Sequence, residues 1–214
     1  DNVSLLRCKF SGNQGVGYWT DYGATNQTID SCLFEESLDA GLMVEITPGP
    51  VTVTNSVFRR LGQFDYKDWP SAAVLIVGSP DVTFDGCTFF DNGPAAGSNG
   101  PTFNLVNDTR KAEPESESLV RNFKLVNSTV QASRPGTFLF RTGAWNGAPS
   151  AREILAKTAV MDHNVYFNAS RSAWSFENGE LAFMSGKGGQ GWKDEYPDLT
   201  FTQWQSYTGN DRGP

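Results

Sequence analysis

A short pattern of polar and apolar positions recurs along the chain. In each copy the second position is small or polar, and the fourth is apolar and usually aromatic. The clearest copies are residues 7–10, 31–34, 55–58 and 86–89, and weaker ones follow at 127–130 and 163–166. The copies start 24, 24, 31, 41 and 36 residues apart. A period of this size indicates stacked structural units, joined here by loops that are longer after the third copy.

Runs of β-forming residues accompany these copies. Residues 51–55 and 81–85 alternate between apolar and polar side chains, which favours strands over helices. A second short strand is expected in most copies, at 18–21, 42–46, 74–77, 103–106 and 138–141. Two or three short strands in about 24 residues predict one coil of a parallel β-helix, which pairs with the coils above and below it.

We therefore expect an all-β solenoid, a single-stranded parallel β-helix with coils of about 24 residues and longer loop insertions. Equivalent residues would lie ~4.8 Å apart along the axis, so Phe10, Phe34, Phe58 and Phe89 would form an internal stack. A leucine-rich horseshoe needs a Leu/Asn consensus and a propeller needs four strands per unit, and neither pattern is visible. A β-sandwich is the remaining alternative. One helix is expected, at 150–158.

The three cysteines occupy the second position of the repeat. Cys8, Cys32 and Cys87 would therefore face inwards as small buried thiols. A disulfide between Cys8 and Cys32 is an alternative that would have to fit the geometry of parallel neighbours. Their spacing does not resemble that of a zinc site.

Charge and hydropathy limit the classes of partner. The net charge of −7 argues against nucleic acid, which needs a basic face, and mildly against a polyanionic polymer. Neither a membrane-spanning apolar run nor a basic amphipathic segment is present in the sequence, so no membrane partner is expected. Five Asn-X-Ser/Thr sequons give weak support for a secreted or cell-surface protein; they begin at Asn2, Asn26, Asn107, Asn127 and Asn168.

The size of the chain suits one domain with an elongated core. We expect β-helix coils over residues 1–168 and a closing segment over 169–214. Because the chain begins inside a coil without a cap, we also expect it to be part of a longer polypeptide with further N-terminal coils.

The second strands bring two acidic residues together. Aligned on Gly17 and Gly41, the strands place Asp21 one coil from Glu45. If Val44 points into the core, both carboxylates point outwards with Cα atoms ~4.8 Å apart. Two carboxylates this close raise the pKa of one of them, and such a pair can supply the acid and the base or nucleophile of glycoside hydrolysis. The spacing fits a retaining or an inverting mechanism.

Alternatives for this pair are solvated charges at strand ends or ligands of Ca²⁺. Trp19 favours a sugar site, because it would also point outwards and an exposed indole is costly unless it contacts something. The insertion at residues 59–70 adds acidic, basic and aromatic groups on a loop, although a plain solvated loop is the alternative. The further substrate-binding candidates are Asp39, Arg59, Asp65, Tyr66, Trp69 (a second sugar platform) and Arg141, which is expected on the same outer row.

Four segments carry a resemblance to a known family: the glycine, tryptophan and acidic residues of 17–21, the run 28–34, the segment 41–46 and the run 53–58. Together they resemble the right-handed parallel β-helix proteins of the pectin-lyase-like superfamily. The similarity is greatest to its carbohydrate-active branch, which includes glycoside hydrolases. Residues 162–167 and 201–211 resemble the last coil and closing segment of such proteins. In such proteins an asparagine usually stands at the first position of the repeat, directly before the small inward-facing residue. Four copies of this chain have another residue there: Arg7, Ser31, Gly86 and His163.

The resemblance implies a secreted enzyme acting on a poly- or oligosaccharide, with Asp21 and Glu45 as the outward acids. We expect a glycoside hydrolase that needs no cofactor, with Ca²⁺ as an option, and whose groove follows the outer face of the helix. One alternative is a lyase or epimerase acting on uronates through Arg59, Arg60, Tyr66 and Lys67. Another is a non-catalytic, adhesive β-helix at the cell surface.

Overall fold

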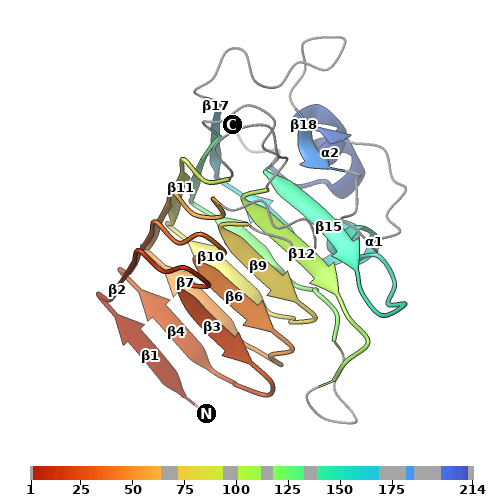
Figure 1. Cartoon of the computed structure of the whole chain (residues 1–214). Helices are drawn as coiled ribbons and strands as arrows, with labels where there is room; N and C mark the ends of the chain where they lie inside the picture. The colour runs from red at the N-terminus through yellow and green to blue at the C-terminus, as the bar shows by residue number, and fades with distance from the viewer. Residues whose placement is uncertain are drawn as a thin grey trace.

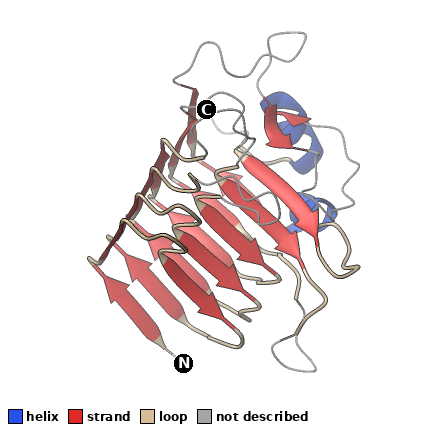
Figure 2. Cartoon of the chain, in the orientation of Figure 1, coloured by secondary structure: helices blue, strands red, loops and turns tan. Residues whose placement is uncertain are grey.

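In a computed structural model the chain winds into a parallel β-helix with three sheets (Figure 1). The structure describes residues 2–63, 72–93, 101–111, 118–132, 139–168, 182–185 and 199–211. Strands dominate the described part of the chain, and its two helices lie toward the C-terminal end (Figure 2). The fold is the one that the repeat predicts.

Each sheet collects one strand from every coil. Sheet A contains β1 (Val3–Leu6), β4 (Gln27–Asp30), β7 (Val51–Thr54), β10 (Val82–Asp85), β13 (Lys124–Val126) and β16 (Val160–Asp162). Sheet B contains β2 (Lys9–Ser11), β5 (Leu33–Glu35), β8 (Val57–Arg59), β11 (Thr88–Phe90), β14 (Thr129–Ala132) and β17 (Val165–Asn168). Sheet C contains β3 (Tyr18–Asp21), β6 (Leu42–Glu45), β9 (Val74–Val77), β12 (Phe103–Asn107), β15 (Phe140–Ala144), β18 (Ala182–Ser185) and the antiparallel β19 (Leu199–Thr200).

The predicted aromatic column runs through the core of the helix. Phe10, Phe34, Phe58 and Phe89 are Cα partners on successive strands of sheet B. Their ring centroids lie 4.8, 4.6 and 4.8 Å apart, and the rings are nearly parallel. This confirms the predicted register, because the period of the sequence becomes the spacing between strands.

Small residues at the corner between sheets A and B form a hydrogen-bonded ladder. The Cys8 N–H donates to Cys32 Sγ at 3.3 Å, and the Cys32 N–H donates to Ser56 Oγ at 3.0 Å. The Cys87 N–H likewise donates to Ser128 Oγ at 3.1 Å. Each small side chain thus satisfies a backbone donor of the preceding coil. The three thiols are free, as expected for inward-facing cysteines.

The residue before each step of this ladder adopts the left-handed backbone conformation. Its φ angle lies between 50° and 65° in all six copies, at Arg7, Ser31, Asn55, Gly86, Asn127 and His163. Asparagine and glycine tolerate this conformation best, which suits Asn55, Gly86 and Asn127 to this corner.

Helices cover the C-terminal part of the core. Helix α1 (Ala151–Thr158) matches the helix expected at 150–158, and Ser150 caps its N-terminus. Helix α2 (Phe201–Thr208) buries Trp204, whose ring stacks on Phe140 with centroids 6.4 Å apart. Neither described helix is long and apolar enough to cross a membrane.

Candidate active site at the carboxyl edge of sheet C

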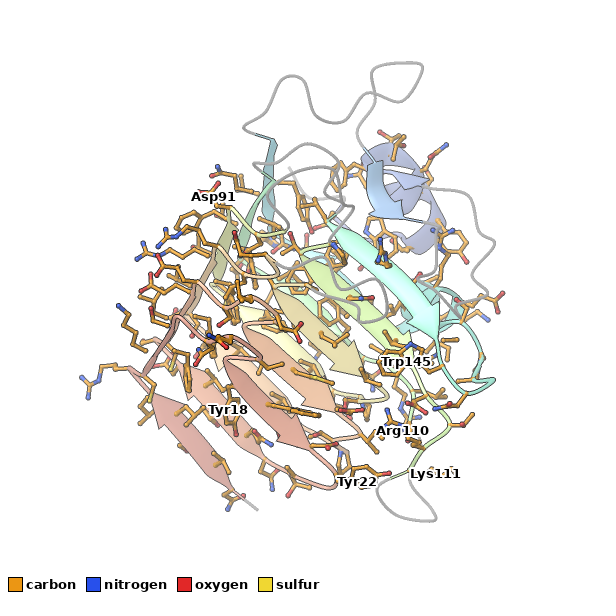
Figure 3. The ribbon with its side chains drawn as sticks, in the orientation of Figure 1. Tyr18, Tyr22, Asp91, Arg110, Lys111 and Trp145 are labelled. Carbon is orange, nitrogen blue, oxygen red and sulfur yellow. The ribbon has the colours of Figure 1, made fainter. Side chains whose placement is uncertain are left out.

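The five strands β3, β6, β9, β12 and β15 are parallel, so their carboxyl ends meet at one edge of sheet C. Asp21 and Glu45 end β3 and β6 at this edge and are direct Cα partners. The segments that follow β12 and β15 begin at the same edge. Figure 3 shows Tyr22, Arg110, Lys111 and Trp145 along it.

Glycines at the entry to the strands allow this register. A Cβ atom added to Gly17 would lie 2.6 Å from the Gly41 carbonyl oxygen, and one added to Gly41 would lie 2.4 Å from Leu61 Cδ1. A larger residue at position 17 would meet the backbone of the next coil, whereas one at position 41 would displace the Leu61 side chain. The aligned glycines therefore mark the true register of sheet C.

The pair of carboxylates faces outwards, as predicted, but its members differ in exposure. Val44 belongs to the main core, whereas its neighbour Met43 belongs to a second apolar cluster on the other face of the sheet. Asp21 is exposed and accepts a hydrogen bond from the Tyr22 N–H at 2.7 Å. The Glu45 side chain is only 5% exposed.

Arg110 compensates the charge of the buried Glu45 carboxylate. Its Nη2 donates to Glu45 Oε1 at 2.6 Å, although the two residues lie 65 positions apart in sequence. Arg110 comes from the segment after β12, so the ion pair passes over the intervening strand β9. A buried carboxylate needs such a partner, because an isolated charge in this environment is very costly.

Asp108 in turn fixes the position of Arg110. Its Oδ2 accepts from Arg110 Nε at 2.8 Å and from Nη2 at 2.6 Å, and its Oδ1 accepts from Asn146 Nδ2 at 2.9 Å. Burial alone would raise the pKa of Asp108, but the hydrogen bonds from Arg110 and Asn146 outweigh it and lower the pKa. Hydrogen bonding to Asp108, opposed by burial and reinforced by Glu45, raises the pKa of Arg110.

An apolar layer covers the middle of the outer face of sheet C. Met43, Leu75, Val77 and Val106 are fully buried on this side, and Trp145 packs against them with its ring centroid 6.0 Å from Arg110 Cζ. A cation over an indole face is a favourable contact. Ligand cannot reach these four positions, so a groove along the outer face of the helix would have to pass beside this layer.

Two aromatic residues beside the acids are accessible. Trp19 is 50% exposed and lies two positions before Asp21 on the same face of β3, and Tyr22, directly after Asp21, is 55% exposed. Residues two apart on a strand are ~6.6 Å apart. The most accessible groups of the site are therefore Trp19, Asp21 and Tyr22 on the first described coil, whereas the side chains of Arg110 and Glu45 are 39% and 5% exposed.

The other predicted substrate-binding residues do not join this cluster. Arg59 lies on the outer face of sheet B, with its Nη2 2.5 Å from Glu35 Oε2. Asp39 precedes β6, at the opposite end of that strand from Glu45, and is buried. Arg141 does lie on the outer row of Trp19, four strands further along. Asp65, Tyr66 and Trp69 fall outside the residues that the structure describes.

Four residues of the site that are not among the predicted ones follow the later strands of sheet C. Asp108 and Arg110 lie just after β12, and Trp145 and Asn146 just after β15. A polar run after a strand aligned with β6 must start at the same edge as Glu45, and this could have identified Asp108 and Arg110. Within the described ranges, no group of three His, Cys, Asp or Glu side chains is arranged to hold a metal ion.

Comparison with known proteins identifies the fold family. The sequence profile of the family described as "right handed beta helix region" matches residues 1–111. Among solved structures, the chain is similar to the A-module of the mannuronan C-5 epimerase AlgE4 from Azotobacter vinelandii, with a TM-score of 0.59 and 17% sequence identity. The similarity covers 77% of this chain and 41% of that one, so the chain spans less than half of its length. No curated protein matches the sequence.

Proposed function

The chain belongs to the family of right-handed β-helix regions, and from that premise we propose that it is a carbohydrate-active enzyme, a glycoside hydrolase working at the carboxyl edge of sheet C. The observation that carries the proposal is the register of β3 and β6, which makes Asp21 and Glu45 direct neighbours on the outer face. Paired carboxylates are the usual groups for cleaving a glycosidic bond.

The surroundings of the two acids assign them different roles. Glu45 forms its ion pair with Arg110 as a carboxylate, so it suits the step that needs a negative charge. It would activate a water molecule or attack the anomeric carbon. Asp21, the accessible member of the pair, would be the acid: it takes a proton from solvent and gives it to the glycosidic oxygen as the bond to the anomeric carbon breaks. Either course produces a new reducing end.

The aromatic side chains beside Asp21 suit the binding of sugar. Trp19 and Tyr22 flank Asp21 in sequence and are about half exposed. Aromatic rings offer an apolar face to the C–H groups of a pyranose and a polar edge to water. A sugar ring on Trp19 would bring the adjoining glycosidic bond to the Asp21 carboxyl group.

The test is a screen of the chain against a panel of polysaccharides, with detection of new reducing ends. Asp21→Asn and Glu45→Gln should each lower turnover by at least about 10²-fold, the usual contribution of general acid–base catalysis. Asp21→Asn should leave the melting temperature nearly unchanged, because Asp21 is exposed. Glu36→Gln is the matched control, since Glu36 is an exposed carboxylate that pairs with Arg60 near sheet B. Wild-type turnover in both site variants would disprove the assignment.

A second candidate is action on uronates, as a lyase or an epimerase. It is favoured by the similarity in fold to a mannuronan C-5 epimerase. The readouts differ: elimination creates a conjugated double bond that absorbs ultraviolet light, whereas epimerisation changes the NMR spectrum of the polymer without cutting it. Binding of a polysaccharide with none of these changes would instead identify a non-catalytic binding module.

A further inference from the structure

We infer that the ligand of the carboxyl edge is an uncharged glycan rather than a polyuronate. This inference rests on the proposed function, because it names the substrate class of the same site. It follows from the way in which the charges of the described residues are paired.

Among the described residues at the carboxyl edge, three carboxylates (Asp21, Glu45 and Asp108) outnumber two cations, Arg110 and Lys111 (Figure 3). Arg110 pairs with two carboxylates, those of Glu45 and Asp108, both at 2.6 Å. Asp21 adds a third carboxylate in direct register with Glu45. The guanidinium group is therefore already more than compensated, and its hydrogen bonds to Asp108 hold it in a fixed direction. A sugar carboxylate arriving here would compete with these two buried acids for Arg110.

The arginines that the sequence suggested for a uronate are also compensated. Arg59 approaches Glu35 Oε2 to 2.5 Å, and Arg60 pairs with both Glu35 and Glu36, at 3.3 and 2.7 Å. Lys9 approaches the other oxygen of Glu35 at 2.8 Å. These cations serve the packing of sheet B and lie on a different sheet from Asp21.

A neutral sugar makes different demands, which this edge meets. Stacking on Trp19 or Tyr22 requires no charge, and Asp21 can accept hydrogen bonds from sugar hydroxyl groups. A polyuronate carries a carboxylate on every residue, so a chain lying across the edge would place like charges beside Asp21. Like charges at this distance lower affinity, most strongly at low ionic strength.

The experiment measures binding by biolayer interferometry on immobilised polymers, separately from cleavage. Neutral glucan, xylan and mannan are compared with polygalacturonate and alginate at low and at high salt. The expected result is binding to a neutral polymer at least about tenfold tighter than to either polyuronate, with little dependence on salt. Polyuronate binding that is stronger and weakens with salt would overturn the inference, and so would failure to bind any polymer.

Two variants connect the binding to the edge. Trp19→Ala should weaken binding to the neutral polymer by about tenfold, the value of one aromatic contact. Tyr207→Ala is the matched control, because Tyr207 is an equally exposed aromatic residue on α2. Neutral binding without new reducing ends would retain this inference while removing the hydrolase, whereas cleavage of a preferred polyuronate would remove this inference and leave the hydrolase.

Discussion

Two buried glutamates on different sheets show how the same scaffold treats charge in two ways. Glu35 on sheet B and Glu45 on sheet C each end a strand, each have a side chain 5% exposed, and each pair with arginine. The register neighbours of Glu35 can bind its carboxylate: Ser11 lies on one side and Arg59 on the other. Glu45 has Asp21 on one side and Val77 on the other, and takes its cation from a distant segment.

The difference distinguishes a structural charge cluster from a candidate site. On sheet B the repeat itself supplies the compensating charges, so the cluster needs nothing outside the ladder. On sheet C the ladder juxtaposes like charges and would be unfavourable without Arg110. Unfavourable pairs that a fold retains and compensates elsewhere are more typical of functional sites than of packing.

The largest expected effect comes from breaking the scaffold that both regions share. Phe58 is fully buried and stacks on Phe34 and Phe89. Phe58→Ala should lower the free energy of unfolding by about 3–5 kcal/mol, because it removes a core ring and leaves a cavity in the column. Denaturant titration measures this value. A loss below ~1 kcal/mol would contradict the continuous aromatic core.

The next largest effect distinguishes the charge cluster of sheet B from the candidate site on sheet C. Arg110→Met would leave two nearly inaccessible carboxylates, Glu45 and Asp108, without their cation. Because the Arg110 side chain is itself 39% exposed, we expect a loss of about 1–3 kcal/mol, below that of a fully buried pair. Arg59→Met is the control and should cost less, since Lys9 and Arg60 still compensate Glu35. Equal losses in thermal unfolding would contradict the proposed difference between the sheets.

The smallest effect is a pH dependence that Glu35 contributes from sheet B. Hydrogen bonds from Lys9 and then Arg59 lower the pKa of Glu35 from 4.5 to about 2. A lowered pKa stabilises the fold above the unfolded pKa of 4.5, and this stabilisation is lost as the pH falls toward about 2. Glu35→Gln should therefore melt at a lower temperature than the wild type at neutral pH. The difference should disappear near pH 2, and a constant difference would count against this origin.

Much of the fold could be predicted because it repeats. One aligned column, that of Phe10, Phe34, Phe58 and Phe89, fixes the register of a whole sheet, and Gly17 and Gly41 fix the register of another. The boundary of β15 was less accurate, since the expected strand at 138–141 corresponds to Phe140–Ala144. That strand follows a long insertion, where the repeat no longer sets the spacing.

Within the site, only the contacts between residues on neighbouring strands of the same sheet could be predicted. Asp21 and Glu45 are one coil apart, so their contact follows from the period. Arg110 is a neighbour of Glu45 because of how the segment after β12 folds back across β9, and no period encodes this. Arg59 starts a charged insertion, which predicts a place in the site, but its position in β8 puts it in the sheet B ladder, opposite Glu35.

The most direct test of the account is a crystal structure of Asp21→Asn with an oligosaccharide from the polymer that the chain binds best. The account predicts a sugar ring stacked on Trp19, with a glycosidic oxygen beside the side chain of residue 21 and the Glu45–Arg110 ion pair intact. A sugar seated over sheet B near Arg59 and Arg60, with Trp19 uncovered, would contradict it.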